Sequence, residues 1–207
     1  MIAKALAEET AKRTSVVCLP VIPFGVSSHH KHLCGTIFIA PRIFKEYVKE
    51  VCSSLKYYNV RKVVIVNGHG GNRCALVEMT RELREENMFI SVFQWWEASA
   101  KLWPDIFQLN ERGHAGAEET SMNLALHSKL VKIDKTVDEE PRKHIAKIEG
   151  LTLPLYTVDE TSSGVYGKST TASATKGKEI LETVVGELVK HVEMLKRTKI
   201  EDLIQKK

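Results

Sequence analysis

The feature that most constrains the fold is a short apolar run that leads straight into a glycine-rich turn and a helical pattern. VVIV (63–66) is β-branched throughout and lacks polar alternation, which is typical of a strand buried on both faces. NGHGGN (67–72) follows, and an amphipathic helical pattern then runs from Ala75 to Leu83. A strand, a tight turn and a helix in this order form the repeating unit of a parallel α/β sheet. We therefore expect His69 at the carboxyl end of a strand, where sites in such sheets lie.

The rest of the chain shows the same alternation of strand and helix patterns. We predict strands at 16–22, 36–39 and 89–96, and helices at 2–12, at 42–57, at a segment opening within 111–121, and from Ile180 to Val192. These segments predict a layered α/β fold with a mainly parallel sheet, as a single domain over 1–207. Residues 133–175 are polar and rich in Gly, Ser and Thr, and we expect an ordered excursion over a site or a partner surface.

The apolar and charged residues argue against membrane and nucleic-acid partners. The longest apolar stretch, 16–26, is broken by Pro20, Pro23 and Gly25, whereas a membrane-spanning helix needs about 20 apolar residues. The net charge is +4, and the basic residues are spread along the chain among acidic ones. A nucleic-acid-binding protein usually clusters its basic side chains on one face. We expect neither a membrane nor a nucleic acid as a partner.

The cysteines indicate a reducing compartment. Cys18, Cys34, Cys52 and Cys74 lie far apart and form no Cys-x-x-Cys pair. Such spacing predicts neither a disulfide framework nor a structural zinc site. We therefore expect a reduced, cytoplasmic protein.

His69 is the sharpest candidate for a functional residue. The glycines of NGHGGN let the backbone turn tightly and let a ligand or metal approach closely, and Asn72 stands where it can cap the next helix. A neutral imidazole in this position is a good ligand for a divalent metal. The alternative is a glycine-rich turn whose histidine is merely hydrogen-bonded.

A second candidate is the segment HAGAEETS (114–121). Glu118 and Glu119 fall in the first turn of the predicted helix, where the helix dipole favours carboxylates. One of them could ligate a metal, and His114 could transfer a proton. The alternative is a capping arrangement with solvated acids.

Two further groups are candidates for substrate contacts. SSHHKH (27–32) carries three histidines that could ligate a metal or orient a substrate, although a surface loop fits these residues equally well. Trp95 and Trp96 end the predicted strand 89–96, so they would point to opposite faces of the sheet. At most one of them would line a pocket, while the other would pack in the core.

These motifs, in this order, resemble the creatininase (creatinine amidohydrolase) family. The matching segments are PFGVS (23–27) with His30 and GTI (35–37), VIVNGHGGN (64–72), HAG (114–116) with ETS (119–121), and SGVYG (163–167). The resemblance covers nearly the whole chain. NGHGGN followed by HAG-x-x-ETS is specific as a pair.

The resemblance implies a three-layer α/β/α fold that assembles as a homohexamer. It also implies two divalent metals per subunit, zinc, manganese or iron, in a site that hydrolyses a cyclic or formyl amide of a small molecule. By this match His69 and Glu119 would be metal ligands and His114 the catalytic proton-transfer residue. His30 stands where the family has a pocket histidine that contacts substrate.

The chain also departs from the family pattern. Family members begin with a strand that ends in Glu-x-His, followed by an aspartate that bridges the metals, and no Glu-x-His occurs here. The segment Ile2–Glu9 resembles the helix after that aspartate, so the first family strand and its ligands are missing. The glutamate usual just after His-Ala-Gly is Ala117 here, with Glu118 displaced by one position.

The missing ligands leave two interpretations. A catalytic metal typically needs about three protein ligands, and His29, His30 or His32 could supplement His69 and Glu119. In the first interpretation the chain is a truncated form of a normal metal hydrolase, and the codons upstream of Met1 would encode Glu-x-His. In the second it is a catalytically inactive binding or assembly subunit without a stoichiometric metal.

Overall fold

The computed structural model describes residues 1–142 and 151–205. The longer helices are α1 (Ile2–Thr14), α2 (Pro41–Ser54), α3 (Arg73–Glu85), α6 (Ala117–His127) and α8 (Ala174–Arg197). The shorter helices are α4 (Trp95–Ser99), α5 (Trp103–Ile106), α7 (Thr157–Glu160) and α9 (Ile200–Leu203). The strands are β1 (Lys62–Asn67), β2 (Phe89–Gln94), β3 (Asp138–Glu139) and β4 (Gly167–Lys168).

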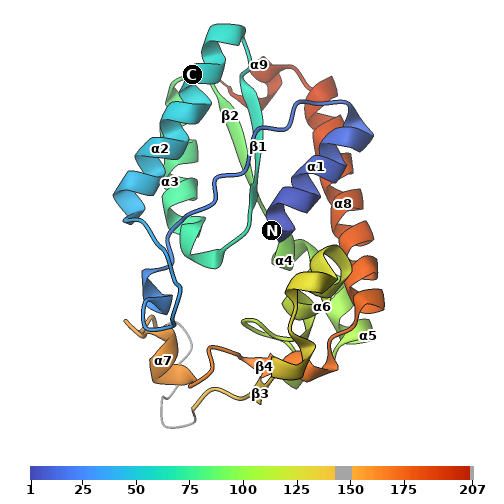
Figure 1. Cartoon of the computed structure of the whole chain (residues 1–207). Helices are drawn as coiled ribbons and strands as arrows, with labels where there is room; N and C mark the ends of the chain where they lie inside the picture. The colour runs from blue at the N-terminus through green and yellow to red at the C-terminus, as the bar shows by residue number, and fades with distance from the viewer. Residues whose placement is uncertain (143–150, 206–207) are drawn as a thin grey trace.

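A parallel pair of strands forms the centre of the molecule. β1 and β2 pair in register from Lys62 opposite Phe89 to Asn67 opposite Gln94, with α3 as the connection between them. The short strands β3 and β4 form a separate antiparallel pair. Figure 1 shows α2 and α3 on one side of β1 and β2, and α1 and α8 on the other.

Alternate residues of the two strands face the two helical layers. Val63, Ile65 and Val92 pack against one core cluster, whose buried side chains come largely from α2 and α3. Val64, Val66 and Phe93 pack against a second cluster, built around Leu6 of α1 and the apolar face of α8. Because successive strand residues point to opposite faces, one sheet supports both cores. The three-layer α/β/α fold and the parallel sheet are confirmed.

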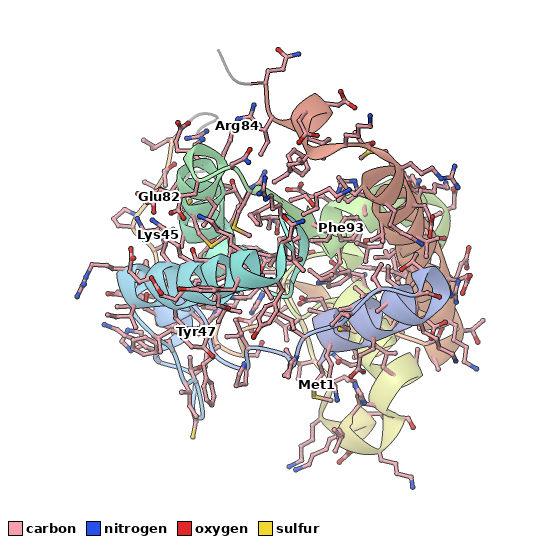
Figure 2. The ribbon with its side chains drawn as sticks, turned by 90° about the horizontal axis from the view of Figure 1, so that it is seen from above. Met1, Lys45, Tyr47, Glu82, Arg84 and Phe93 are labelled. Carbon is pink, nitrogen blue, oxygen red and sulfur yellow. The ribbon has the colours of Figure 1, made fainter. Side chains whose placement is uncertain are left out.

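Charged side chains join α2 to α3 at the surface. Lys45 Nζ lies 2.7 Å from Glu82 Oε1 and 3.1 Å from Glu78 Oε1, and Lys49 Nζ lies 2.7 Å from Glu82 Oε2. Figure 2 shows Lys45 and Glu82 on neighbouring helices on the outer side of this layer. These hydrogen-bonded lysines lower the pKa of Glu82 to about 2.

The predicted strands at 16–22 and 36–39 are wrong. Both segments are without regular secondary structure, and no strand of the described ranges 1–142 and 151–205 pairs with either. A strand persists only when a neighbour satisfies its N–H and C=O groups, and Pro20 lacks an N–H to offer. The apolar residues of 16–22 are therefore not buried in a sheet, and Val17 is 87% exposed.

The predicted strand at 89–96 is correct up to Gln94 and wrong beyond it. β2 ends where its partner β1 ends, since Asn67 and Gln94 are the last register pair. Trp95 and Trp96 open α4 instead. The predicted helices correspond to α1, α2, α3, α6 and α8, with bounds that differ by a few residues.

The segment 133–175 carries short elements, among them α7 and the strands β3 and β4, and its part at 143–150 lies outside the described residues. None of the helices described within 1–142 and 151–205 is both long enough and apolar enough to cross a lipid bilayer. The assignment of 1–207 as a single domain stays a prediction.

The contact between α6 and α8 depends on a glycine. A Cβ added to Gly177 would overlap the carbonyl oxygen of Ser121 and lie 3.0 Å from the Ala125 Cβ. Gly186, on the same helix, has no such neighbour within 4 Å. The approach of α8 to α6 therefore requires the absence of a side chain at Gly177.

We expect Gly177→Ala to lower the free energy of unfolding by on the order of 1–3 kcal/mol, because overpacking forces the helices apart. The matched control Gly186→Ala should raise it by up to about 1 kcal/mol, because alanine favours the helix. Urea unfolding followed by circular dichroism measures both. Equal stabilities of the two variants would contradict this account of the α6–α8 contact.

Candidate functional site

A buried amide network shapes the turn that carries His69. Asn67 is 2% exposed, and its Nδ2 donates to Gln94 Oε1 at 2.8 Å and to the His69 carbonyl at 2.9 Å. Its Oδ1 accepts the N–H of His69 at 3.2 Å. The side chain at the end of β1 therefore binds both the neighbouring strand and the turn that follows.

Asn72 ties a second loop to this turn. Its Oδ1 accepts the Val26 N–H at 2.8 Å, and its Nδ2 donates to Asn67 Oδ1 at 3.1 Å. Asn72 does stand at the N-cap position of α3, but its side chain makes no capping hydrogen bond. The predicted capping role is therefore wrong, because the amide is engaged in holding the loop that contains Val26.

That loop brings two histidines onto His69. His69 Nδ1 lies 3.0 Å from the Val26 carbonyl oxygen, and its Nε2 lies 3.2 Å from His30 Nε2. The His29 ring stacks on the His69 ring with centroids 5.3 Å apart and an interplanar angle of 6°. His30 Nδ1 is also 2.6 Å from Thr157 Oγ1. Ligand atoms of His29, His30 and His69 all lie within 4.8 Å of one another.

His114 joins this cluster from the loop before α6. Its ring stacks on His30 with centroids 4.5 Å apart and meets the Tyr166 ring at 5.9 Å. The His114 carbonyl accepts the Tyr166 N–H at 2.7 Å. Gly113, with φ 140°, provides the left-handed backbone that aims this loop.

Glu119 lies in the first turn of α6, where its Oε2 accepts the Ala115 N–H at 2.6 Å. It lines a cavity of about 370 Å³ together with Gly68, Ala115, Thr120 and Asn123. Burial raises the pKa of the Glu119 carboxyl, while the Ala115 N–H and His69 oppose the shift. His69 and Glu119 are thus close enough for their charges to interact, but the residues that line this cavity do not include His69.

The imidazoles are held in their neutral form. Burial lowers the pKa values of His29, His30, His69 and His114, and the repulsion between neighbouring rings lowers those of His29, His30 and His69 further. For His30 the pKa falls to about 3. Neutral imidazoles keep a nitrogen lone pair, which is what a divalent metal requires.

Glu118, which the sequence offered as a possible metal ligand or a solvated capping acid, is a buried carboxyl. It is 4% exposed, its Oε1 accepts the Gly113 N–H at 2.8 Å, and its Oε2 has no hydrogen-bond partner among the described residues. Burial raises the pKa of Glu118 to about 7, against the effect of the Gly113 N–H. The side chain therefore packs beneath the loop that carries His114.

Trp95 and Trp96 are not brought to the histidines. Trp95 is 1% exposed within the core formed by α1, α6 and α8, and Trp96 packs against the same core. Their rings meet edge to face at 6.1 Å. A substrate contact for either residue stays a prediction without support from these positions.

Sequence patterns missed several contributors to the site. Thr157 and the Val26 carbonyl orient the cluster, yet neither carries a local signal, since each acts through a partner distant in the chain. Tyr166 lies in the SGVYG motif, which was noted only as part of the resemblance. His29 was one of three loop histidines that the sequence could not rank.

A sequence model of the creatininase family, described as creatinine amidohydrolase, matches residues 1–192. The chain belongs to the creatininase family. This membership confirms the resemblance that the motifs indicated.

Individual members of the creatininase family show how far the likeness extends. The creatinine amidohydrolase of Pseudomonas putida is 28% identical over 205 residues, covering 87% of this chain and 75% of the relative. The mycofactocin precursor peptide peptidase of Mycobacterium ulcerans is 29% identical over 84% of this chain, which spans 64% of that relative's length. A solved structure described as creatininase Mn superposes with a TM-score of 0.79 and 25% identity, covering 95% of this chain and 82% of the other.

We expect the buried Glu118 carboxyl to make the folded state less stable as pH rises. The pKa of this carboxyl is about 7 in the folded state against its ordinary value of 4.5, so the stabilisation is full below pH 4.5, falls as pH rises from there, and is gone above about pH 7. The loss amounts to at most about 3 kcal/mol. Glu118→Gln stays uncharged, so its stability relative to the parent chain should rise across this window.

Urea unfolding between pH 4 and pH 8, with chelator present, measures the difference between the two chains. The exposed Glu140 supplies the control variant, Glu140→Gln, which should show no such rise. A pH-independent difference for Glu118→Gln would contradict the assignment.

Proposed function

We propose that this chain is a metal-dependent hydrolase of a non-peptide C–N bond, of the cyclic or formyl amide type, in a small molecule. The convergence of His30, His69 and His114 from three distant segments carries the proposal. Burial and the repulsion between protonated rings keep these imidazoles neutral, so they keep the lone pairs that a divalent ion binds. A histidine that only hydrogen-bonds within a turn would not need such neighbours. Membership of a hydrolase family agrees with this chemistry.

The donor set fits a divalent metal such as zinc, manganese or iron. Imidazole nitrogens suit zinc and iron, and a carboxylate such as Glu119 suits manganese as well. A bound ion supplies polarisation of the carbonyl group and a more acidic water. His69 and Glu119 are the ligands that the family match proposes, and two ions per subunit are part of the same proposal.

His114 is suited to move the proton in this reaction. Its imidazole is neutral because burial lowers its pKa, so it can accept a proton from the attacking water. The same nitrogen can then protonate the leaving amine or amide nitrogen, which would otherwise depart as a poor anion. Stacking on His30 and edge contact with Tyr166 hold the ring in one orientation.

The cavity beside Glu119 supports a small substrate. Its volume of about 370 Å³ is near the lower end of small-molecule pockets, and Gly68, next to His69, forms part of its wall. A compact cyclic or formyl amide fits such a space. No histidine of the described residues lines the cavity itself, and we propose that a substrate held there reaches His69 past Gly68.

The assembly and the compartment are part of the same proposal. A homohexamer follows from the family resemblance, and the exposed apolar residues Val17, Tyr57 and Tyr58 are available to a subunit interface. The cysteines of the described residues are free, which suits a reducing cytoplasm. Light scattering coupled to size-exclusion chromatography would determine the number of subunits.

A second candidate is a non-catalytic binding or assembly subunit. One observation favours it: the metal-ligand cluster of the described residues contains histidines alone, without a carboxylate to bridge two ions. This alternative predicts binding of a ligand or of other subunits without turnover.

We expect the purified chain loaded with Zn²⁺ or Mn²⁺ to hydrolyse creatinine or another member of a panel of cyclic and formyl amides. His114→Ala should lower kcat by about 10²- to 10⁴-fold, because it removes the proton-transfer group. The control His32→Ala alters an exposed histidine of the same loop region as His30, whose ring contact is with Tyr156 rather than with the cluster.

Product formation measured by chromatography distinguishes the possibilities. A metal-loaded chain that turns over no member of the panel would overturn the hydrolase proposal in favour of the non-catalytic subunit. Full activity in His114→Ala would show that the proton is moved by another group.

A further inference from the structure

We infer that the ion in this chain is held by three imidazoles, those of His29, His30 and His69, with Glu119 outside the ligand set. The inference deepens the proposed function and rests on it for the presence of a metal. It assigns His30 to the ion rather than to the substrate, and it gives His29 a role that the family match leaves open. Within 1–142 and 151–205, these histidines form the group of potential metal ligands whose ligand atoms all lie within 4.8 Å of one another.

The hydrogen bond at Nδ1 fixes the protonation of His69. The Val26 carbonyl oxygen, 3.0 Å away, can only accept, so Nδ1 carries the proton. The neutral ring then has its lone pair at Nε2, which points at His30. Metal-ligating histidines show this arrangement, with one nitrogen bound to a carbonyl and the other free for the ion.

His30 can adopt the same arrangement without a net change in protons. Thr157 Oγ1, 2.6 Å from Nδ1, can either donate or accept. Without an ion, Nε2–H of His30 donates to His69 Nε2 and the threonine hydroxyl donates to Nδ1. With an ion, the ring proton moves to Nδ1, the hydroxyl rotates to accept it, and both Nε2 lone pairs face the ion.

The spacing of the two nitrogens matches a tetrahedral site. Zinc binds imidazole nitrogen at about 2.0–2.1 Å, so two ligands of a tetrahedral ion lie about 3.3 Å apart. His30 Nε2 and His69 Nε2 are 3.2 Å apart. The pair therefore already stands at the separation that one shared ion would require.

Gly71 makes room for the third imidazole. A Cβ at this position would lie 3.0 Å from His29 Cε1 and 3.1 Å from His69 Cε1, and it would overlap the Val26 carbonyl. The glycine thus lets the His29 ring stack parallel to His69 and 4.0 Å from the centroid of His30. Three protein nitrogens leave a fourth position for water or substrate, as in catalytic zinc sites.

Glu119 is engaged elsewhere. Its Oε2 accepts the Ala115 N–H at 2.6 Å, and it does not belong to the group of ligand atoms within 4.8 Å. It lines the adjacent cavity, where its carboxyl group is placed to hydrogen-bond to water or substrate. We therefore expect it to orient water or substrate rather than to bind the ion.

Zn²⁺ binding to the full purified chain tests the ligand set without reference to activity. Isothermal titration with Zn²⁺ alone should show one ion per chain bound at this histidine site, whether or not a second, separate ion binds as the family resemblance implies. His29→Ala should weaken binding by about 100-fold or more, beyond the loss typical of removing an outer partner of a ligand. The matched control His32→Ala and the variant Glu119→Gln should each bind within a few-fold of the parent.

A spectroscopic measurement guards against misfolding of the alanine variant. The parent chain loaded with Co²⁺ should show the intense visible absorption of a four-coordinate nitrogen site, and His29→Gln, of similar size, should lose that band while keeping its circular dichroism. Loss of Zn²⁺ binding in Glu119→Gln but not in His29→Ala would overturn the inference. So would a six-coordinate Co²⁺ spectrum.

The failure of this inference is distinguishable from that of the proposed function. Zn²⁺ binding that depends on His29, in a chain that hydrolyses none of the amides, leaves the ligand set intact and overturns the hydrolase. Hydrolysis by a chain whose Zn²⁺ affinity is unchanged in His29→Ala supports the hydrolase and overturns the ligand set.

Discussion

The parallel pairing of β1 with β2, and the amide contact that closes it, positions everything of functional interest. Asn67 and Gln94 are the last pair of the register, and their side chains hydrogen-bond to each other. Asn67 also binds the backbone of the turn that presents His69. A buried amide left unsatisfied would cost about 1–3 kcal/mol, so this network fixes one geometry of the turn.

The same buried setting explains the character of the histidine cluster. Four imidazoles approach one another, and burial together with mutual repulsion keeps them uncharged. Burying four imidazoles so close together lowers the stability of the folded state unless a ligand binds them. The loop at 25–30 is nevertheless held in place by Asn72 and Thr157, which oppose any relaxation of the rings away from His69. Binding of one common ligand by these rings is the simplest physical reason for holding them so close together.

The sequence predicted the long helices and the strands β1 and β2 because their periodicity is local and strong. It failed at 16–22, where apolar composition suggested a strand but no neighbouring strand satisfies the backbone within the described ranges. It placed His30, His69 and His114 among the candidates, and the fold does bring these three together. It expected at least one of Trp95 and Trp96 in the core, and both pack there. It could not foresee that β2 ends at Gln94, because the end of β2 is set by the end of its partner strand.

The sequence by itself determined the layered α/β class, the place of His69 after a buried strand, and the family, because these depend on periodicity and on motifs read along the chain. Only the tertiary structure decided which histidines meet. His29 and His30 reach His69, and Thr157 reaches His30, through contacts between segments far apart in the chain. Local patterns carry no information on such encounters, since the packing of the whole chain sets the distance between remote side chains.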